Sequence, residues 1–110
     1  MAESTPDVIS RYLRAADRKE IEALASCFAP EGIVVDEGIT YPGHDQIVGW
    51  RQSLASTWEY TSALRRVEPA GPGEWNASVH IEGNFPGGQA DLTYSFTVVD
   101  DKVSALSIVE

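Results

Sequence analysis

Apolar residues in the first half of the chain recur every three or four positions, which is the period of an amphipathic helix. A first helix is expected to start at residues 4–7, which supply a hydroxyl cap, a proline for the first turn and an early acid. Residues 17–20 resemble a capping box that closes this helix and opens a second one, which ends at Phe28 and Pro30. The same spacing predicts a third helix over residues 44–57.

After Trp58 the spacing becomes alternating, and β-branched and aromatic residues become frequent. A shorter strand is expected earlier, at residues 33–37, followed by an extended return at 38–43. The later strands, joined by tight turns, are expected at residues 60–68, 74–84, 89–99 and 102–109. The sequence therefore predicts a single α+β domain, residues 1–110, in which three N-terminal helices pack on a strongly curved antiparallel sheet.

The alternation within the strands predicts where the core and a cavity lie. In the strand at residues 89–99, one face carries only apolar residues and the other carries aspartate, threonine and serine. The helices must cover the apolar face, whereas the polar face suits solvent or a partner subunit. Three helices against a curved sheet would form a cystatin-like cone with an internal pocket. The large side chains available to line it are Tyr12, Trp50, Trp58, Trp75 and Tyr94.

Asp36 is the leading candidate for a catalytic residue because it is an acid within an otherwise apolar strand. A carboxylate in such a place is paired, is exposed by strand alternation, or is held in a pocket. Arg51 and Arg65 are the partners considered for pairing. In a pocket, Asp36 becomes a candidate general base. Glu37 is expected to point to the opposite face and to be solvated.

The charge and the residue counts exclude several classes of function. The 110 residues carry a net charge of −9, which argues against binding to nucleic acid. No apolar run approaches the roughly 18 residues of a membrane span, and the polar N-terminus does not resemble a secretion signal. The single Cys27 fits a reducing cytoplasm. The spacing matches no metal-binding motif for His44, His80 and Cys27, and no glycine loop matches a phosphate-binding motif. No metal and no cofactor are therefore expected.

Four segments carry a family resemblance. They are residues 11–17 (RYLRAAD), residues 28–38 (FAPEGIVVDEG), residues 41–47 (YPGHDQI) with Trp50, and residues 98–103 (VVDDKV). They resemble the nuclear transport factor 2-like superfamily, and within it the SnoaL-like and ketosteroid isomerase-like branch. The resemblance covers nearly the whole chain and implies the cone-shaped fold. It leaves the activity open, because the superfamily holds isomerases, cyclases, epoxide hydrolases, dehydratases and binding modules.

The resemblance to ketosteroid isomerase implies roles for three residues. Asp36 matches the strand position of the general base, and Tyr12 matches the first-helix tyrosine that donates to the developing oxyanion. Tyr94 takes the place of a second donor, which is a protonated aspartate in that enzyme, and a phenol can donate the same bond. Asp36, Tyr12 and Tyr94 are thus the candidate catalytic residues. The candidate pocket-lining residues are Phe28, Trp50, Trp58, Trp75 and Phe96.

Two functions remain open on the sequence. The first is a cofactor-independent isomerase or cyclase, in which Asp36 removes a proton beside a carbonyl group and the tyrosines stabilise the enolate. The second is a non-catalytic module that binds a small ligand or pairs with another copy. The expected partners are a small apolar molecule and a second subunit of a homodimer, which contacts the polar sheet face. His80 lies on that face and is expected at the surface or at the subunit contact.

Overall fold

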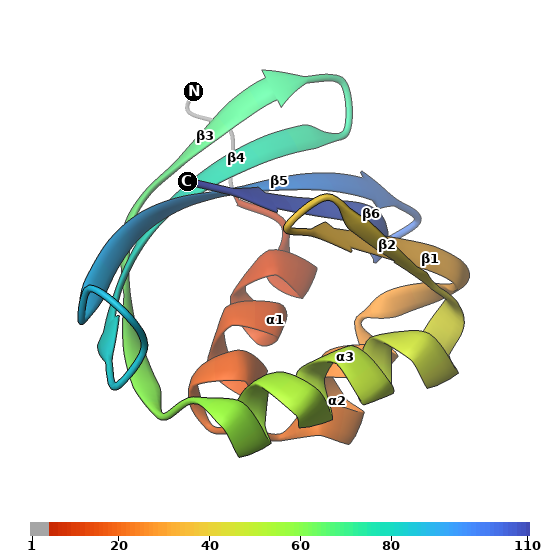
Figure 1. The fold of residues 1–110 in the computed structure, drawn as a ribbon. Coiled ribbons are helices and arrows are strands. Elements are labelled where there is room, and N and C mark those ends of the chain that lie inside the picture. The colour runs from red at the N-terminus through yellow and green to blue at the C-terminus, as the bar shows by residue number, and fades with distance from the viewer. Residues whose placement is uncertain (1–4) are drawn as a thin grey trace.

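The computed structural model describes residues 5–110, and Ser4, part of the expected first helix start, lies outside them. Three helices lie on the concave side of a six-stranded sheet that arches over them (Figure 1). The helices are α1 (Asp7–Asp17), α2 (Ile21–Ser26) and α3 (Gly43–Thr57). The strands are β1 (Phe28–Asp36), β2 (Ile39–Pro42), β3 (Tyr60–Gly71), β4 (Glu74–Gly83), β5 (Gln89–Val99) and β6 (Lys102–Val109).

The connection between α1 and α2 differs from the expected capping box. No side chain of the described residues caps the start of either helix. Instead, Lys19 adopts a left-handed φ of 60°, and the backbone N–H of Glu20 donates to the carbonyl of Ala15 at 2.9 Å. This backbone arrangement closes α1 in the manner of a Schellman motif, so that its last carbonyls need no side-chain partner. The capping-box prediction is therefore wrong.

Helix α2 is shorter than its apolar stripe predicts. The helix ends at Ser26, and Phe28 opens β1 instead of closing α2. Phe28 pairs with Val103 of β6, and the N–H of Val103 donates to the carbonyl of Cys27 at 2.9 Å. A strand partner far away in the sequence thus overrides the local helical spacing.

The sheet has the strand order β2-β1-β6-β5-β4-β3. The strands from β3 to β6 form the expected antiparallel meander, whereas β1 pairs with β6 in parallel. The sheet is therefore mixed and not wholly antiparallel, while the predicted class of three helices on a curved sheet is confirmed. Alternation along a strand shows which face is buried but not which strand lies beside it, so the parallel pair was not visible in the sequence.

The concave face of the sheet meets α1 in the core. Tyr12 of α1 is only 1% exposed, and its ring lies edge-on to Phe96 at 5.4 Å and to Tyr94 at 6.3 Å between centroids. Both partners belong to the apolar face predicted for β5, and both are buried. Edge-on aromatic pairs contribute about 0.5–1.5 kcal/mol each beyond the area they bury. This packing fixes α1 under the sheet and leaves the space beside α3 for a pocket.

Candidate functional site

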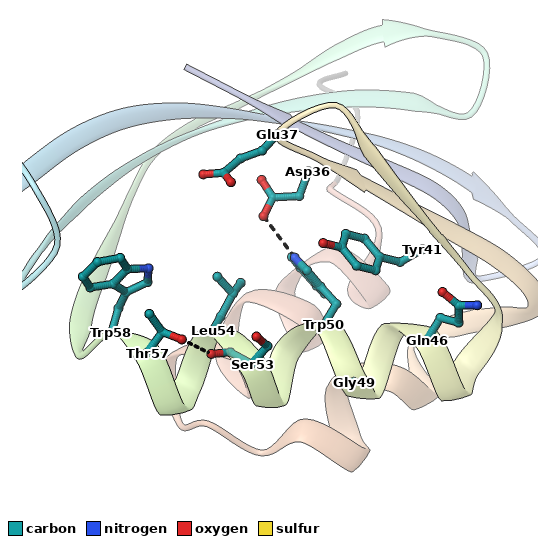
Figure 2. A pocket seen from close by; sticks show the side chains of 10 residues that line it. All are labelled: Asp36, Glu37, Tyr41, Gln46, Gly49, Trp50, Ser53, Leu54, Thr57 and Trp58. Atoms are coloured by element: carbon teal, nitrogen blue, oxygen red, sulfur yellow. Dashed lines mark hydrogen bonds between the residues drawn. The ribbon is translucent and has the colours of Figure 1, made fainter.

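A pocket of ≈ 490 Å³ lies between α3 and the adjoining ends of β1 and β2 (Figure 2). Figure 2 shows Trp50 reaching up from α3 toward Asp36, and Glu37 extending sideways above Asp36. The volume suits a small organic molecule. The residues that line the pocket are Asp36, Glu37, Tyr41, Gln46, Gly49, Trp50, Ser53, Leu54, Thr57 and Trp58.

Asp36 is held firmly at the pocket wall. Its backbone is the last position of β1 and pairs with Ile39 of β2 on one side and with Ile108 of β6 on the other. Its Oδ2 accepts a hydrogen bond of 3.0 Å from the indole Nε1 of Trp50. Its Oδ1 has no hydrogen-bond partner among residues 5–110. A half-buried carboxylate at the wall of a pocket, with one oxygen held and the other unpaired, is arranged as a general base requires.

The structure does not pair Asp36 with either arginine considered in the sequence. Within the described residues, neither Arg51 nor Arg65 forms an ion pair with it. Glu37 is exposed, as expected, but it lines the same pocket instead of the opposite face. The reason is that β1 ends at Asp36, and Glu37 enters a turn with a φ of 53°, where strand alternation no longer applies.

Tyr12 and Tyr94 lie together in the core and are absent from the residues that line the pocket. Neither hydroxyl has a hydrogen-bond partner among residues 5–110, and neither is sealed from solvent. Burial raises the pKa of Tyr12 well above its usual value, with a smaller contribution from Tyr94. Burial likewise raises the pKa of Tyr94. Both phenols therefore stay protonated at working pH and can donate a hydrogen bond to a ligand that reaches them.

The remaining candidates for pocket lining divide into two groups. Trp50 and Trp58 line the pocket, and Trp58 does so from just beyond the end of α3. Phe28 and Phe96 are 1% exposed and pack on Tyr12 from two sides. Trp75 is half-buried against the core, opposite Phe96 in the sheet. The structure thus places the first two in the lining of the same pocket as Asp36, and the other three in or against the core.

Arg51 and Tyr60 form a contact that the sequence did not reveal, and neither is among the residues that line the pocket. Arg51 of α3 is 6% exposed, and its Nη1 donates to the hydroxyl of Tyr60 at 2.6 Å. Its spacing could have identified it, because Arg51 lies four residues after Ile47 and three before Leu54, on the apolar face of its helix. Tyr60 carried no comparable signal, since it stands at the start of a strand.

His80 lies away from the pocket on the polar face of β4. Its Nδ1 is 2.7 Å from Asp91 and its Nε2 is 2.9 Å from Glu82. The hydrogen bonds to Asp91 and then to Glu82 raise the pKa of His80. Between residues 5 and 110, no three metal-ligating side chains are grouped so that they could hold an ion. None of the helices described there has both the length and the apolar surface to cross a membrane.

Together, the curved sheet, the three helices and the inward carboxylate define a class of small α+β pocket domains. A profile of the SnoaL-like domain matches residues 6–100. With a structure from Sinorhizobium meliloti, provisionally named as a polyketide cyclase, the chain shares 30% identity and a TM-score of 0.90, covering 96% of this chain and 95% of that one. The chain belongs to the SnoaL-like domain family, and its fold is the one shared by ketosteroid isomerase-like and nuclear transport factor 2-like proteins.

Two further structures share the fold at lower identity. A Catenulispora acidiphila protein with a ketosteroid isomerase-like fold, solved with trimethylamine, is 19% identical with a TM-score of 0.86, over 97% of this chain and 87% of that one. A Mycobacterium tuberculosis protein solved with estradiol-17β-hemisuccinate is 11% identical with a TM-score of 0.81, over 97% and 95% of the two chains. No curated protein matches the chain.

Proposed function

We propose that this protein is a cofactor-independent enzyme that moves a proton in a small apolar carbonyl compound, as isomerases and cyclases do. The observation that carries the proposal is Asp36, whose Oδ1 is unpaired at the wall of the pocket while Trp50 holds Oδ2. Oδ1 takes a proton from the carbon beside the carbonyl, and the C–H electron pair moves into the enolate. The same carboxyl group then returns the proton to another carbon, so that no oxidant or reductant is needed.

Tyr12 and Tyr94 are the proposed donors to the enolate oxygen. Both are protonated and lack protein partners among residues 5–110, which supports this role. Asp36 lies close enough for its charge to contribute to the raised pKa of each phenol. The provisional name of the Sinorhizobium meliloti relative and the steroid ester bound by the Mycobacterium tuberculosis protein support a polycyclic apolar substrate.

A second candidate function is a non-catalytic module that binds a small ligand. It is favoured by one observation: neither Tyr12 nor Tyr94 lines the pocket in which Asp36 lies. In this case a ligand would bind between Trp50 and Trp58 without reaching the phenols. The two functions differ in whether proton transfer accompanies binding.

Proton exchange in deuterated water is the test that separates them. We expect the wild-type protein to catalyse exchange of the α-protons of 2-tetralone, an apolar bicyclic ketone, above the rate with an equal concentration of acetate. Tyr12→Phe should slow this exchange by about three- to tenfold, because one neutral hydrogen bond contributes about 0.5–1.5 kcal/mol. Exchange is followed by NMR. Binding of 2-tetralone without any exchange would reject the enzyme and support the binding module.

We also propose a homodimer that pairs through the convex face of the sheet. That face carries a row of uncharged polar residues: Asn76, Ser78, Thr93, Ser95 and Thr97. Sedimentation velocity at micromolar concentration should show a species of twice the 12.0 kDa chain mass. Ser95→Asp should weaken it by placing like charges in the interface, whereas Ser56→Asp, at an exposed position of α3, should not. A single species of 12.0 kDa in the wild type would contradict the dimer.

A reducing cytoplasm is the location that we propose. Cys27 is the single cysteine, and it is free and buried. Burial raises the pKa of its thiol, which keeps it protonated and unreactive. A free thiol of this kind is common where disulfides do not form.

A further inference from the structure

Arg51 is a charged group that the proposed proton transfer does not use. It is the one polar or charged side chain that is buried among residues 5–110, with an exposed fraction of 6%. A buried cation is costly unless an anion compensates it. Yet no ion pair within the described residues includes Arg51. Its positive charge thus has no protein counter-ion there.

The protein partners of Arg51 are neutral oxygens and aromatic rings. Nη1 donates to the hydroxyl of Tyr60 at 2.6 Å, and Nη2 donates to the carbonyl of Ala16 at 3.3 Å. The guanidinium carbon lies 5.8 Å from the ring centroid of Trp50 and 5.7 Å from that of Tyr60. Ala16 is near the C-terminus of α1, where the helix dipole favours a cation. These contacts fix the guanidinium in position, but none neutralises it.

The guanidinium also keeps donors to spare. It has five N–H groups, and the two bonds to Tyr60 and Ala16 leave three without an acceptor among residues 5–110. No polar side-chain atom in that range is both sealed and unpaired. Nε of Arg51, which has no partner in that range, is therefore not sealed from solvent. Arg51 is arranged to receive an anionic oxygen.

We propose that Arg51 binds a carboxylate of the ligand, and that the preferred substrate is therefore a carbonyl compound that also carries a carboxylate on its aromatic or polycyclic frame. The proposal rests on the proposed function, since it names the substrate class of the same pocket. Trp50 connects the two groups: its indole N–H bonds to Asp36, and the guanidinium of Arg51 lies against its ring. Arg51 itself is absent from the residues that line the pocket, so a ligand held beside Asp36 would reach the guanidinium past the ring of Trp50.

A carboxylate fits these observations better than a phosphate. One guanidinium matches a single carboxylate in a two-bonded fork. A doubly charged phosphate needs further cations, whereas the pocket wall supplies the carboxylates of Asp36 and Glu37 and the chain carries a net charge of −9. The apolar rings of Trp50 and Trp58 then contact the rest of the ligand.

The test compares 2-naphthoate with 2-naphthamide, two probes of the same shape that differ in charge. Isothermal titration calorimetry at pH 7 should show the wild type binding the naphthoate about ten- to a hundredfold more tightly, as expected for hydrogen bonds to a charged group. Arg51→Gln should remove this preference, and Arg51→Lys should retain only part of it. Arg65→Gln, which changes an exposed arginine of β3, is the matched control and should keep it.

A measurement on the wild type covers the case in which Arg51 variants do not fold. The Nε–Hε NMR signal of Arg51 should shift on addition of naphthoate and not of naphthamide. Equal affinities for the two probes in the wild type would overturn the proposal, as would a preference that survives in folded Arg51→Gln. Naphthoate preference without proton exchange on 2-tetralone would reject the enzyme but keep the anion site. Proton exchange on 2-tetralone without a preference for naphthoate would keep the enzyme but reject the anion site.

Discussion

Asp36→Asn is expected to slow the exchange of 2-tetralone α-protons by about 10²–10⁴-fold, the usual contribution of a general base. An amide cannot accept the proton, whereas its carbonyl oxygen can still accept the bond from Trp50 Nε1 that holds residue 36 in place. The variant should therefore fold as the wild type does. Exchange rates measured by NMR for both proteins give the ratio.

Glu37→Gln is the matched control for this prediction. Glu37 lines the same pocket and neighbours Asp36 in the chain, but it stands in an exposed turn and its side chain has no hydrogen bond to Trp50. We expect it to keep most of the exchange rate. Full activity in Asp36→Asn would reject Asp36 as the base. Equal losses in both variants would show that the charge of the pocket matters, and not one positioned carboxylate.

Phe96→Ala is expected to lower the free energy of unfolding by about 3–5 kcal/mol, which is typical of truncating a buried phenylalanine. Phe96 is 1% exposed, and its ring packs edge-on against Tyr12 at 5.4 Å and near Tyr94 at 6.3 Å. Removing it leaves a cavity beside the two tyrosines. Urea unfolding followed by far-ultraviolet circular dichroism measures the change.

Val99→Ala tests whether this effect comes from burial. Val99 ends the same strand and is 54% exposed, so its truncation should change the free energy of unfolding by about 0.5 kcal/mol or less. If Phe96→Ala cost no more than Val99→Ala, Phe96 would line an open cavity, as its place among the candidate pocket residues implied. The structure instead gives it the role of holding Tyr12.

Residues with a strong local pattern were predicted well. The alternation of β5 identified Tyr94 and Phe96 as inward-facing, and the spacing of α1 did the same for Tyr12. Asp36 stood out because an acid in an apolar strand demands an explanation, and the structure places it in a pocket. Each of these inferences depended on residues close together in the sequence.

Residues whose surroundings come from distant segments were predicted less well. Arg51 was weighed only as an ion-pair partner for Asp36, because its contacts with Ala16 and Tyr60 join parts of the chain that no local pattern connects. Phe28 was placed in a helix, although its pairing with Val103 of β6 makes it the start of a strand. In both cases a contact across the fold outweighs the local preference.

The sequence by itself determined the fold class, the two faces of the meander and the choice of Asp36, because side-chain periodicity fixes which positions are buried. Only the tertiary structure decided that β1 pairs in parallel with β6, that Trp50 holds Asp36, and that Arg51 is buried without a carboxylate partner among residues 5–110. The physical reason is that hydrogen bonds and charge compensation depend on which groups meet in space. That meeting is set when the sheet curves over the helices and brings distant segments together.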